Sequence, residues 1–518
     1  MLKIYNSSKK AYKKHGKSLI KLKKTKKLIK NVVIDDEISV NNSNDMIEYF
    51  LCRPTYNKEI ERGFHVKNKS ITQFEITFNY TNSNTDENIP DINEYYGGFC
   101  YNMTVKRGVK KAKINIMDKS GLDYNKVYHG FKSMFTPDIR NFNNKLENLL
   151  NPEIKLTNKI DKIDKLYEAI YFARLLINLP PNIKTFNLIV KLIREFNDKI
   201  IGNFIKKNKF ELKIDTIPLS KLNKLNNGNN LLSAFNNNPD NSGLLIIEYN
   251  SKKKNKNKNK PIIFVGKGVL FDSGGYNLKS SKNMTDMKTD MAGMAICIGV
   301  ILGIANMNIE IPIDIKIICP IITNLIGENT ILPSSVYTSL SGKKIEVVDT
   351  DAEGRLIIGE AINYCYDRWS NTKGETEFDT IIDIATLTGQ QDDLGSKMFA
   401  NALYNKQGKV LYNRLMGASM ANNEPIYELP LMEEYSYLLE SDIADYKNIS
   451  DKWQSDIIVG GLFIYKMLPN TIKTHKNIKW IHIDIAGVAN NINDIKMYYP
   501  KGGSGFGIRT IIDFLGRF

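Results

Sequence analysis

The alternation of apolar and polar positions divides the chain into a weakly patterned N-terminal part and a strongly patterned C-terminal part. In the first part, the pattern predicts a strand over residues 74–80 and a short helix over residues 127–135, separated by Asn-rich turns. Apolar residues at helical spacing over residues 160–177 predict a helix that ends before Pro180 and Pro181, because proline cannot continue a helix. We expect this helix to link two domains.

The C-terminal part alternates β-rich apolar runs with helical ones. The β-rich runs are 261–269, 311–321, 344–348, 378–385 and 479–485, and the helical runs are 284–304, 353–369 and 505–515. This order is typical of an α/β domain with a mostly parallel sheet flanked by helices. In such sheets, ligand sites form where loops leave the carboxyl ends of the strands.

The length of 518 residues exceeds what one hydrophobic core supports, which is about 250 to 300 residues. We predict a smaller N-terminal α/β domain besides the C-terminal one. The expected segments are a Lys-rich extension (1–44), an N-terminal α/β domain (45–155), a linker helix (156–182) and a C-terminal domain (183–518), with a Lys/Asn-rich surface loop at 252–260.

The net charge of +16 is concentrated in two segments. Twelve lysines lie in residues 1–34 and six in residues 252–260, and the rest of the chain is nearly neutral. A nucleic-acid interface requires basic residues on one face together with aromatic side chains or a known motif, and neither is evident. We therefore do not expect nucleic-acid binding to be the main role, and the Lys/Asn-rich stretch is predicted to be a solvated loop.

The sequence offers no feature that places the protein in a membrane or an oxidising compartment. No apolar run approaches the roughly 18 residues needed to span a bilayer, and residues 1–34 lack the apolar core of a secretory signal. The five cysteines are widely spaced and form no Cys-x-x-Cys pair, so free thiols are expected. We predict a cytoplasmic protein that does not bind membranes.

Four carboxylates stand at loop-like, often Gly-flanked positions: Asp272, Asp290, Asp351 and Glu353. Brought together and buried, they would repel one another unless cations lay among them, and two divalent ions would balance their charge. None of the five histidines has the His-Glu-x-x-His spacing, which excludes a single-zinc peptidase built on that motif. Carboxylate-rich ligation suits paired zinc, manganese or magnesium.

Each motif taken alone also has a simpler explanation. Asp351, Glu353 and Arg355 could form the first turn of a helix, where acidic residues are favoured. Lys267 could be a surface lysine, and its Gly-Lys-Gly context fails the phosphate-loop pattern because Pro261 stands in place of the first glycine. Taken without the other motifs, Met287 and Ala486 are better interpreted as core residues.

Together the motifs resemble the signatures of the leucyl aminopeptidase family. The resemblance rests on Val265-Gly266-Lys267-Gly268, Asp272-Ser273-Gly274-Gly275, Thr350-Asp351-Ala352-Glu353-Gly354-Arg355-Leu356, Ala385-Thr386-Leu387-Thr388-Gly389, His482-Ile483-Asp484-Ile485-Ala486-Gly487 and Gly505-Phe506-Gly507-Ile508-Arg509. It covers roughly residues 165 to 515. It implies a metal-dependent aminopeptidase that hydrolyses the N-terminal peptide bond through a hydroxide bridged by two metals.

The resemblance also implies a role for each site residue. One metal would be held by Lys267, Asp272, Asp290 and Glu353, and the other by Asp272, Asp351 and Glu353. The metals would be zinc, with manganese, cobalt or magnesium possible at the exchangeable site. Lys279 would stabilise the oxyanion, and Arg355 would hold a bicarbonate ion that shuttles protons. A pocket for Leu-like or Met-like first residues of peptide substrates would be lined by Met287, Thr386, Leu387, Gly389, Ala486 and Ala489.

Family members form homohexamers, so the same assembly is expected here. Asp349 departs from the family, which usually has Asn at this position. His482 and Asp484 are interpreted as structural. Two alternatives stay open: a non-catalytic scaffold or nucleic-acid-binding relative, and a dipeptidase or Cys-Gly-cleaving enzyme that uses the same site.

Overall fold

The computed structural model separates the chain into two compact units. Unit 1 comprises Met1–Pro137, Leu150–Tyr167 and Asn491–Lys501, and unit 2 comprises Asp138–Leu149, Glu168–Asn490 and Gly502–Phe518. The described residues are 5–6, 19–20, 32–33, 46–51, 55–56, 63–68, 73–80, 92–106, 111–116, 123–139, 146–150, 152, 155–157, 159–204, 209–222, 224, 230–235, 241–252, 260–370, 375–389, 396–450, 455–474, 478–491 and 499–518. Most of the predicted extension 1–44 and of the predicted loop 252–260 lies outside them.

The described residues of unit 1 include a sheet and the helices α1 and α2. The sheet runs in the order β1-β6-β7-β4-β8-β9, with β5 beside β7. Its helices α1 and α2 pack so closely that a Cβ on Gly97 would lie 2.0 Å from the carbonyl oxygen of Val127. The elements are β1 (Tyr5–Asn6), β4 (Met46–Leu51), β5 (Thr55–Tyr56), β6 (Gly63–Asn68), β7 (Gln73–Tyr80), β8 (Lys111–Ile116), β9 (Lys155–Leu156), α1 (Ile92–Lys106), α2 (Tyr124–Ser133) and a separate pair, β2 (Leu19–Ile20) with β3 (Val32–Val33).

Unit 2 is built on a sheet whose central strands are parallel. Among the described residues, the strand order is β10-β11-β14-β12-β17-β21-β18-β19, with β13 beside β14. β12 pairs in parallel with β14 and β17, and β17 with β21, whereas β10, β11 and β18 add antiparallel pairs. The strands are β10 (Phe210–Pro218), β11 (Gly243–Ser251), β12 (Ile262–Gly266), β13 (Gly268–Asp272), β14 (Ile315–Asn324), β17 (Thr380–Ala385), β18 (Ala400–Tyr404), β19 (Ile426–Glu428) and β21 (Lys479–Asp484).

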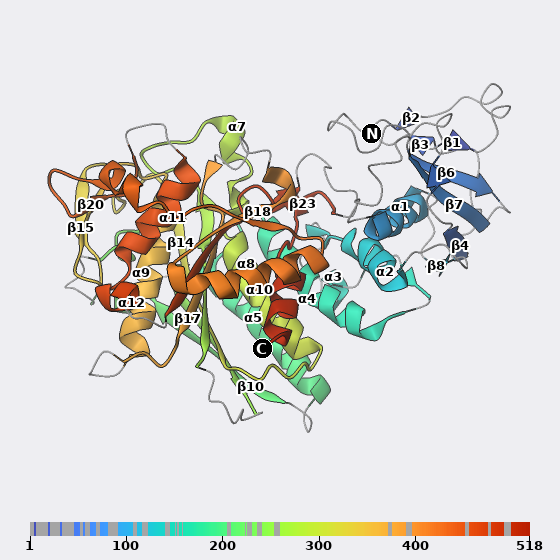
Figure 1. The fold of residues 1–518 in the computed structure, drawn as a ribbon, viewed down its shortest axis with the longest axis horizontal. Helices are drawn as coiled ribbons and strands as arrows, with labels where there is room; N and C mark the ends of the chain where they lie inside the picture. Colours follow the sequence, from blue (N-terminus) through green and yellow to red (C-terminus); the bar gives the residue numbers. More distant parts are fainter. Residues whose placement is uncertain are drawn as a thin grey trace. The chain divides into compact units, whose positions relative to one another are not determined.

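Helices cover both faces of this sheet, as Figure 1 shows. A Cβ on Gly266 of β12 would lie 2.7 Å from the α carbon of Met294, so helix α8 lies directly against one face. Ile263 and Val265 of β12 share a hydrophobic core with α9 and α11 on the other face. Gly266 contacts one face and its neighbour Val265 the other because successive residues of a strand point to opposite faces of the sheet. The mixed α/β fold with helices flanking a large sheet confirms the predicted fold class.

The helices of unit 2 include long core helices and short connecting ones. They are α3 (Leu146–Leu149), α5 (Phe186–Phe204), α6 (Leu219–Leu222), α7 (Ser281–Met284), α8 (Ala292–Asn306), α9 (Glu353–Arg368), α10 (Lys409–Ala421), α11 (Asp456–Met467), α12 (Asn470–Thr474) and α13 (Ile508–Gly516). Helix α4 (Asp161–Asn178) contains the boundary between the units and lies where the sequence predicts the linker. A small sheet of β15 (Ser335–Thr338), β16 (Lys344–Val347) and β20 (Tyr446–Lys447) completes the unit.

The apolar run that forms α8 is a core helix. All of its residues are buried, which explains why it is apolar on every side. Within the described part of the chain, every helix is too short or too polar to cross a bilayer. The cysteines Cys100, Cys297, Cys319 and Cys365 are free and buried, as predicted, and Cys52 lies outside the described residues.

Candidate metal centre

The carboxyl ends of the central strands bring one group of charged residues together. Lys267 directly follows β12, Asp272 ends β13, and Asp290 follows the short 3-10 helix η5 (Met287–Thr289). Asp351 and Glu353 lie where the chain enters α9. This edge of a largely parallel sheet is where the sequence predicts a ligand site.

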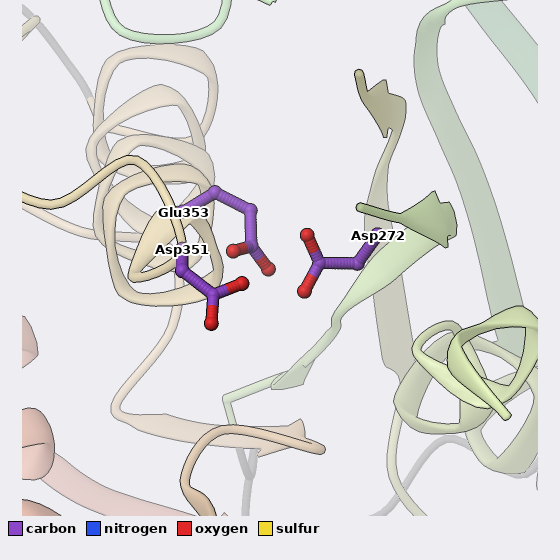
Figure 2. A group of neighbouring side chains, drawn as sticks. All are labelled: Asp272, Asp351 and Glu353. Carbon is purple, nitrogen blue, oxygen red and sulfur yellow. The ribbon is translucent and has the colours of Figure 1, made fainter. Parts of the chain in front are cut away.

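Three carboxylates form the centre of this group. Asp272, Asp351 and Glu353 each offer an oxygen, and these atoms all lie within 4.8 Å of one another. Figure 2 shows Asp351 and Glu353 at the start of α9, facing Asp272 of β13. Asp272 and Glu353 are buried and Asp351 is partly exposed. Like charges this close destabilise the fold unless cations lie among them.

Two lysines lie among these carboxylates. The Nζ atom of Lys267 is 2.8 Å from Asp290 Oδ1 and 2.8 Å from Glu353 Oε1, and it also donates to the carbonyl oxygen of Thr386. The Nζ atom of Lys279 is 2.8 Å from Asp272 Oδ2 and also pairs with Asp351. The structure thus brings together all five predicted metal ligands and Lys279.

Glycines in the signature motifs make this close approach possible. Gly274 has a φ of +86°, which L side chains rarely adopt, and a Cβ there would lie 2.9 Å from Asp351 Oδ1. A Cβ on Gly354 would lie 2.7 Å from Lys267 Nζ. A side chain at either position would push the charged groups apart.

Asn324 is a site residue that the sequence analysis missed. Its Nδ2 donates to Asp272 Oδ1 at 2.8 Å and to the carbonyl oxygen of Thr350 at 2.9 Å, so it fixes the carboxylate of β13 relative to the turn before α9. Its position in the sequence could have indicated this role, because Asn324 is a polar residue that ends the apolar strand β14 at the carboxyl edge of the sheet. Such a partner orients a ligating carboxylate.

Asp349 supports the backbone of the same turn. Its Oδ1 accepts a hydrogen bond from the backbone N–H of Asp351 at 2.7 Å, a contact that an Asn side-chain oxygen could make equally well. The buried Asn448 accepts from the backbone N–H groups of Val348 and Asp349 and donates to the carbonyl oxygen of Asp349. This acid, which departs from the family pattern, therefore has a local structural role.

The electrostatics of the site leave it short of positive charge. Burial raises the pKa of Asp351 to about 7, and the Asp272 carboxylate adds to the rise. Burial likewise raises the pKa of Glu353 and that of Asp290. Burial alone would lower the pKa of Lys267, but the carboxylates of Asp290 and Glu353 raise it above its usual value. Two ammonium groups therefore face four acids.

The residues present fit divalent cations. Asp290 is 5% exposed, and its Oδ2 accepts no hydrogen bond from the described residues, which leaves a buried lone pair for a metal. The carboxylates supply the hard oxygen ligands that zinc, manganese and magnesium accept. Lys267 lies between Asp290 and Glu353 as an ammonium group, so it would have to lose a proton before its nitrogen could bind a metal.

The predicted pocket residues fall into two groups. Thr386 donates from Oγ1 to Asp290 Oδ1 at 2.7 Å, and Met287 begins the 3-10 helix that leads to Asp290, so both adjoin the carboxylates. Gly389 is exposed. Ala489 is buried, and its backbone bonds to Ile485 and Ser504, so its described contacts do not include the metal-centre residues.

Asp484 ties two of the predicted substrate loops together. Its Oδ1 accepts from the backbone N–H of Leu387 at 3.1 Å and from that of Ala486 at 3.0 Å, and its Oδ2 accepts from Thr388 Oγ1 at 2.7 Å. The neighbouring strand residue His482 pairs with Asp383. Burial alone would lower the pKa of His482, and the Asp383 carboxylate raises it. These contacts agree with the structural role expected for His482 and Asp484.

Arg355 lies in the first turn of α9 and is 2% exposed. Its Nη2 donates to Asp456 Oδ1 at 2.8 Å, and its Nη1 donates to the carbonyl oxygen of Asn448 at 3.1 Å. Both terminal nitrogens of the guanidinium group therefore already have a protein partner. Asp456, at the start of α11, is a further residue that the sequence analysis missed.

Comparisons with known proteins identify the family of the chain. The model of the cytosol aminopeptidase family, catalytic domain, matches residues 171–512. A probable cytosol aminopeptidase from Chlamydia caviae is 38% identical over 275 residues, 53% of this chain and 51% of that protein. The aligned part thus spans about half the length of this curated relative.

Solved structures show the same fold. A cytosol aminopeptidase from Coxiella burnetii has a TM-score of 0.69 at 20% identity, covering 93% of this chain and 99% of that chain. The bottromycin maturation enzyme BotP, solved in complex with Mn, has a TM-score of 0.70 at 20% identity, covering 91% of this chain and 99% of that chain. The motifs, the site and the matched catalytic domain lead to one conclusion: the chain belongs to the cytosol aminopeptidase family.

Proposed function

We propose that the protein is a metal-dependent aminopeptidase that removes the first residue of peptides. The observation that carries the proposal is the convergence of Asp272, Asp351 and Glu353 within 4.8 Å, with Lys267 and Lys279 among them. The few neutral donors around these carboxylates do not offset their mutual repulsion, so the group is suited to binding cations. BotP, which shares the fold, was solved in complex with manganese, and this agrees with a metal-dependent protein.

Two overlapping sets of residues would hold the two metal ions. Lys267, Asp272, Asp290 and Glu353 would hold one ion, and Asp272, Asp351 and Glu353 the other. When bound, two divalent ions supply an activated water and polarise the scissile carbonyl. Zinc is the expected metal, with manganese, cobalt or magnesium able to replace it at the more exposed position. Asp351 is the most exposed of these ligands, which supports exchange at the second position.

Lys279 is suited to stabilising the oxyanion. Its ammonium group lies against Asp272 and Asp351, and carboxylates that hold the side chain in place also keep it charged. Burial alone would lower the pKa of Lys279, but Asp272, Glu353 and Asp351 raise it above its usual value. A fixed positive charge beside the developing alkoxide lowers the barrier, since it needs no reorganisation.

The loops after β17 and β21 would hold the first residue of the substrate. Thr386, Leu387 and Ala486 are partly buried, and Asp484 holds the last two in place through their backbone N–H groups. Together with Met287, these side chains are apolar or small, which favours Leu-like or Met-like residues. We further propose a cytoplasmic homohexamer, which native mass spectrometry would test.

The proposal is tested with Leu-amide and its N-acetylated form. Metal-stripped protein resupplied with zinc, manganese or cobalt should cleave only the substrate with a free amine. The Asp351→Asn variant should lose activity, whereas Asp367→Asn, which changes an exposed acid at the other end of α9, should not. Folded protein that cleaves neither substrate with any metal would refute the proposal.

A further inference from the structure

Lys184, in the turn between α4 and α5, is a buried lysine that joins two segments of the backbone. Its Nζ donates to the carbonyl oxygen of Ile177 at 2.9 Å and also to the carbonyl oxygen of Lys288. Lys184 is 2% exposed, and a lysine is rarely buried this completely unless its amine is paired. Here the amine connects the end of α4 to the 3-10 helix η5, which are distant in the sequence.

The sequence explains why the carbonyl group of Ile177 needs this donor. The last carbonyl groups of a helix have no N–H partner within the helix. The residue four positions after Ile177 is Pro181, which has no N–H to offer. Ile177 is 0% exposed, so its carbonyl oxygen depends on a donor from the protein. Lys184 supplies that donor from the turn that follows α4.

The second carbonyl group belongs to the segment that carries two predicted site residues. Lys288 lies in η5 between Met287, a predicted pocket residue, and Asp290, a predicted metal ligand. Hydrogen bonds in a 3-10 helix have poorer geometry than those of an α-helix, and the N-cap residue of η5 makes no side-chain capping bond. Residues 281–283 before η5 are exposed, whereas α8 after it is buried. Lys184 thus fastens η5 to the buried end of α4.

The two hydrogen bonds do not depend on the charge of Lys184. Burial lowers the pKa of Lys184, the nearby ammonium group of Lys288 lowers it further, and the Asp290 carboxylate partly offsets this effect. A protonated lysine has three N–H donors, and the neutral amine still has two. Both carbonyl oxygens therefore have a donor in either state.

We propose that Lys184 is a positioning residue whose amine holds η5 against the end of α4 and so keeps Asp290 and Met287 in place at the metal centre. In the proposed function, Asp290 holds an ion at the first metal position and takes no part in the second. Loss of the Lys184 amine should therefore affect one metal position more than the other. The inference rests on the proposed aminopeptidase function, which gives Asp290 its role as a ligand.

The test is zinc titration of the full chain against a competing chelator, which measures two binding constants. Lys184→Met keeps an unbranched side chain and removes the amine. It should weaken zinc binding at the first position by about 10- to 100-fold, as loss of an outer partner of a metal ligand does, and leave the second close to the wild type. Asp290→Asn identifies the constant that belongs to the first position. The double variant should bind no more weakly than Asp290→Asn alone, because effects that act through one residue are not additive.

The matched control is Lys343→Met. Lys343 also donates from Nζ to two backbone carbonyl oxygens, those of Lys466 and Leu468, but it does so at the C-terminal end of α11. This variant should leave both zinc constants unchanged. Lys184→Gln, whose shorter side chain keeps two N–H donors, should weaken the first constant less than Lys184→Met does. It also decides the question if Lys184→Met does not fold.

The outcomes separate this inference from the proposed function. Equal weakening of both constants by Lys184→Met, or a double variant weaker than Asp290→Asn, would show that Lys184 supports the fold in general and would overturn the inference. Unchanged constants in Lys184→Met and Lys184→Gln would overturn it as well. Wild-type protein that binds two zinc ions and cleaves no peptide would overturn only the proposed function, and wild-type protein that binds no zinc would overturn both.

Discussion

Helix α9 carries two buried glutamates that have very different surroundings. Glu353 is 1% exposed and Glu360 is 0% exposed, and seven residues, about two turns, separate them on the same side of the helix. Glu353 lies beside Lys267 and is one of the three clustered carboxylates. Glu360 accepts hydrogen bonds from the backbone N–H groups of Leu231 and Leu340 and from Asn363 Nδ2.

The contrast shows that burial alone does not identify a functional acid. Neutral donors from two loops satisfy Glu360, so it fastens those loops to α9 and needs no ion. Glu353 stands among other carboxylates, and only cations can satisfy such a group. Both have a raised pKa, with burial the largest cause, so the raised value does not separate them either. What distinguishes the functional end of α9 is the charge of the neighbours.

The largest expected effect is on activity at the Glu353 end. Glu353→Gln removes a charge shared by both predicted metal positions, and we expect kcat/KM for Leu-amide to fall by about 10³-fold, or about 4 kcal/mol. Glu360→Gln is the matched control, because it makes the same change two turns away and keeps an acceptor for the loop N–H groups. Equal losses in both variants would remove the distinction between the two ends of α9.

The second effect is on stability at the Glu360 end. Glu360→Ala leaves buried donors of Leu231, Leu340 and Asn363 without an acceptor, which should lower the free energy of unfolding by about 3 to 4 kcal/mol. Urea unfolding of metal-free protein followed by tryptophan fluorescence reports on unit 2, which holds all three tryptophans. Glu360→Gln should recover most of the loss; an unchanged midpoint for the Ala variant would contradict the structural role.

The third effect is a pH dependence of stability. Burial raises the pKa of Glu360 from 4.5 to about 7, so between these values the unfolded chain has lost the proton that the folded protein keeps. Stability should therefore fall as the pH rises through this window, by on the order of 3 kcal/mol from this residue. Glu360→Gln does not titrate, so the difference in unfolding free energy between the two proteins should change between pH 5 and pH 8. A constant difference would show that Glu360 ionises freely in the fold.

Some residues of the candidate site could be predicted from the sequence, and others could not. Lys267, Asp272 and Glu353 could be predicted to lie together because each lies within two residues of a glycine at the start or end of a regular element, where the chain pattern marks the carboxyl edge of the sheet. Glu360 and Asp456 could not, because their partners come from other segments: Leu231 is 129 positions from Glu360, and Arg355 is 101 positions from Asp456. Such roles are set by packing, which one sequence does not show.

Packing that one sequence does not show also limits what could be predicted for the N-terminal part. In unit 1, the predicted strand 74–80 is found as β7, and the predicted helix 127–135 is found as α2, which starts at Tyr124. The contact between α1 and α2 depends on Gly97 and Gly130, where the missing side chains let the backbones meet. Glycines leave no apolar periodicity to follow, so the packing of α1 against α2 could not be predicted.

The smallest expected effect concerns Asn324, whose role also depends on packing. Its amide holds Asp272 and the turn before α9, so Asn324→Ala should weaken metal binding by about 10- to 100-fold while leaving every ligand in place. The control is Asn422→Ala, which removes a similar Asn–Asp bond, from Nδ2 to Asp513 Oδ2 at 3.0 Å, outside the site. Zinc titration against a competing chelator measures the change. If Asn324→Ala binds zinc as tightly as the control, charge alone organises the Glu353 end of α9, and neutral donors matter only at the Glu360 end.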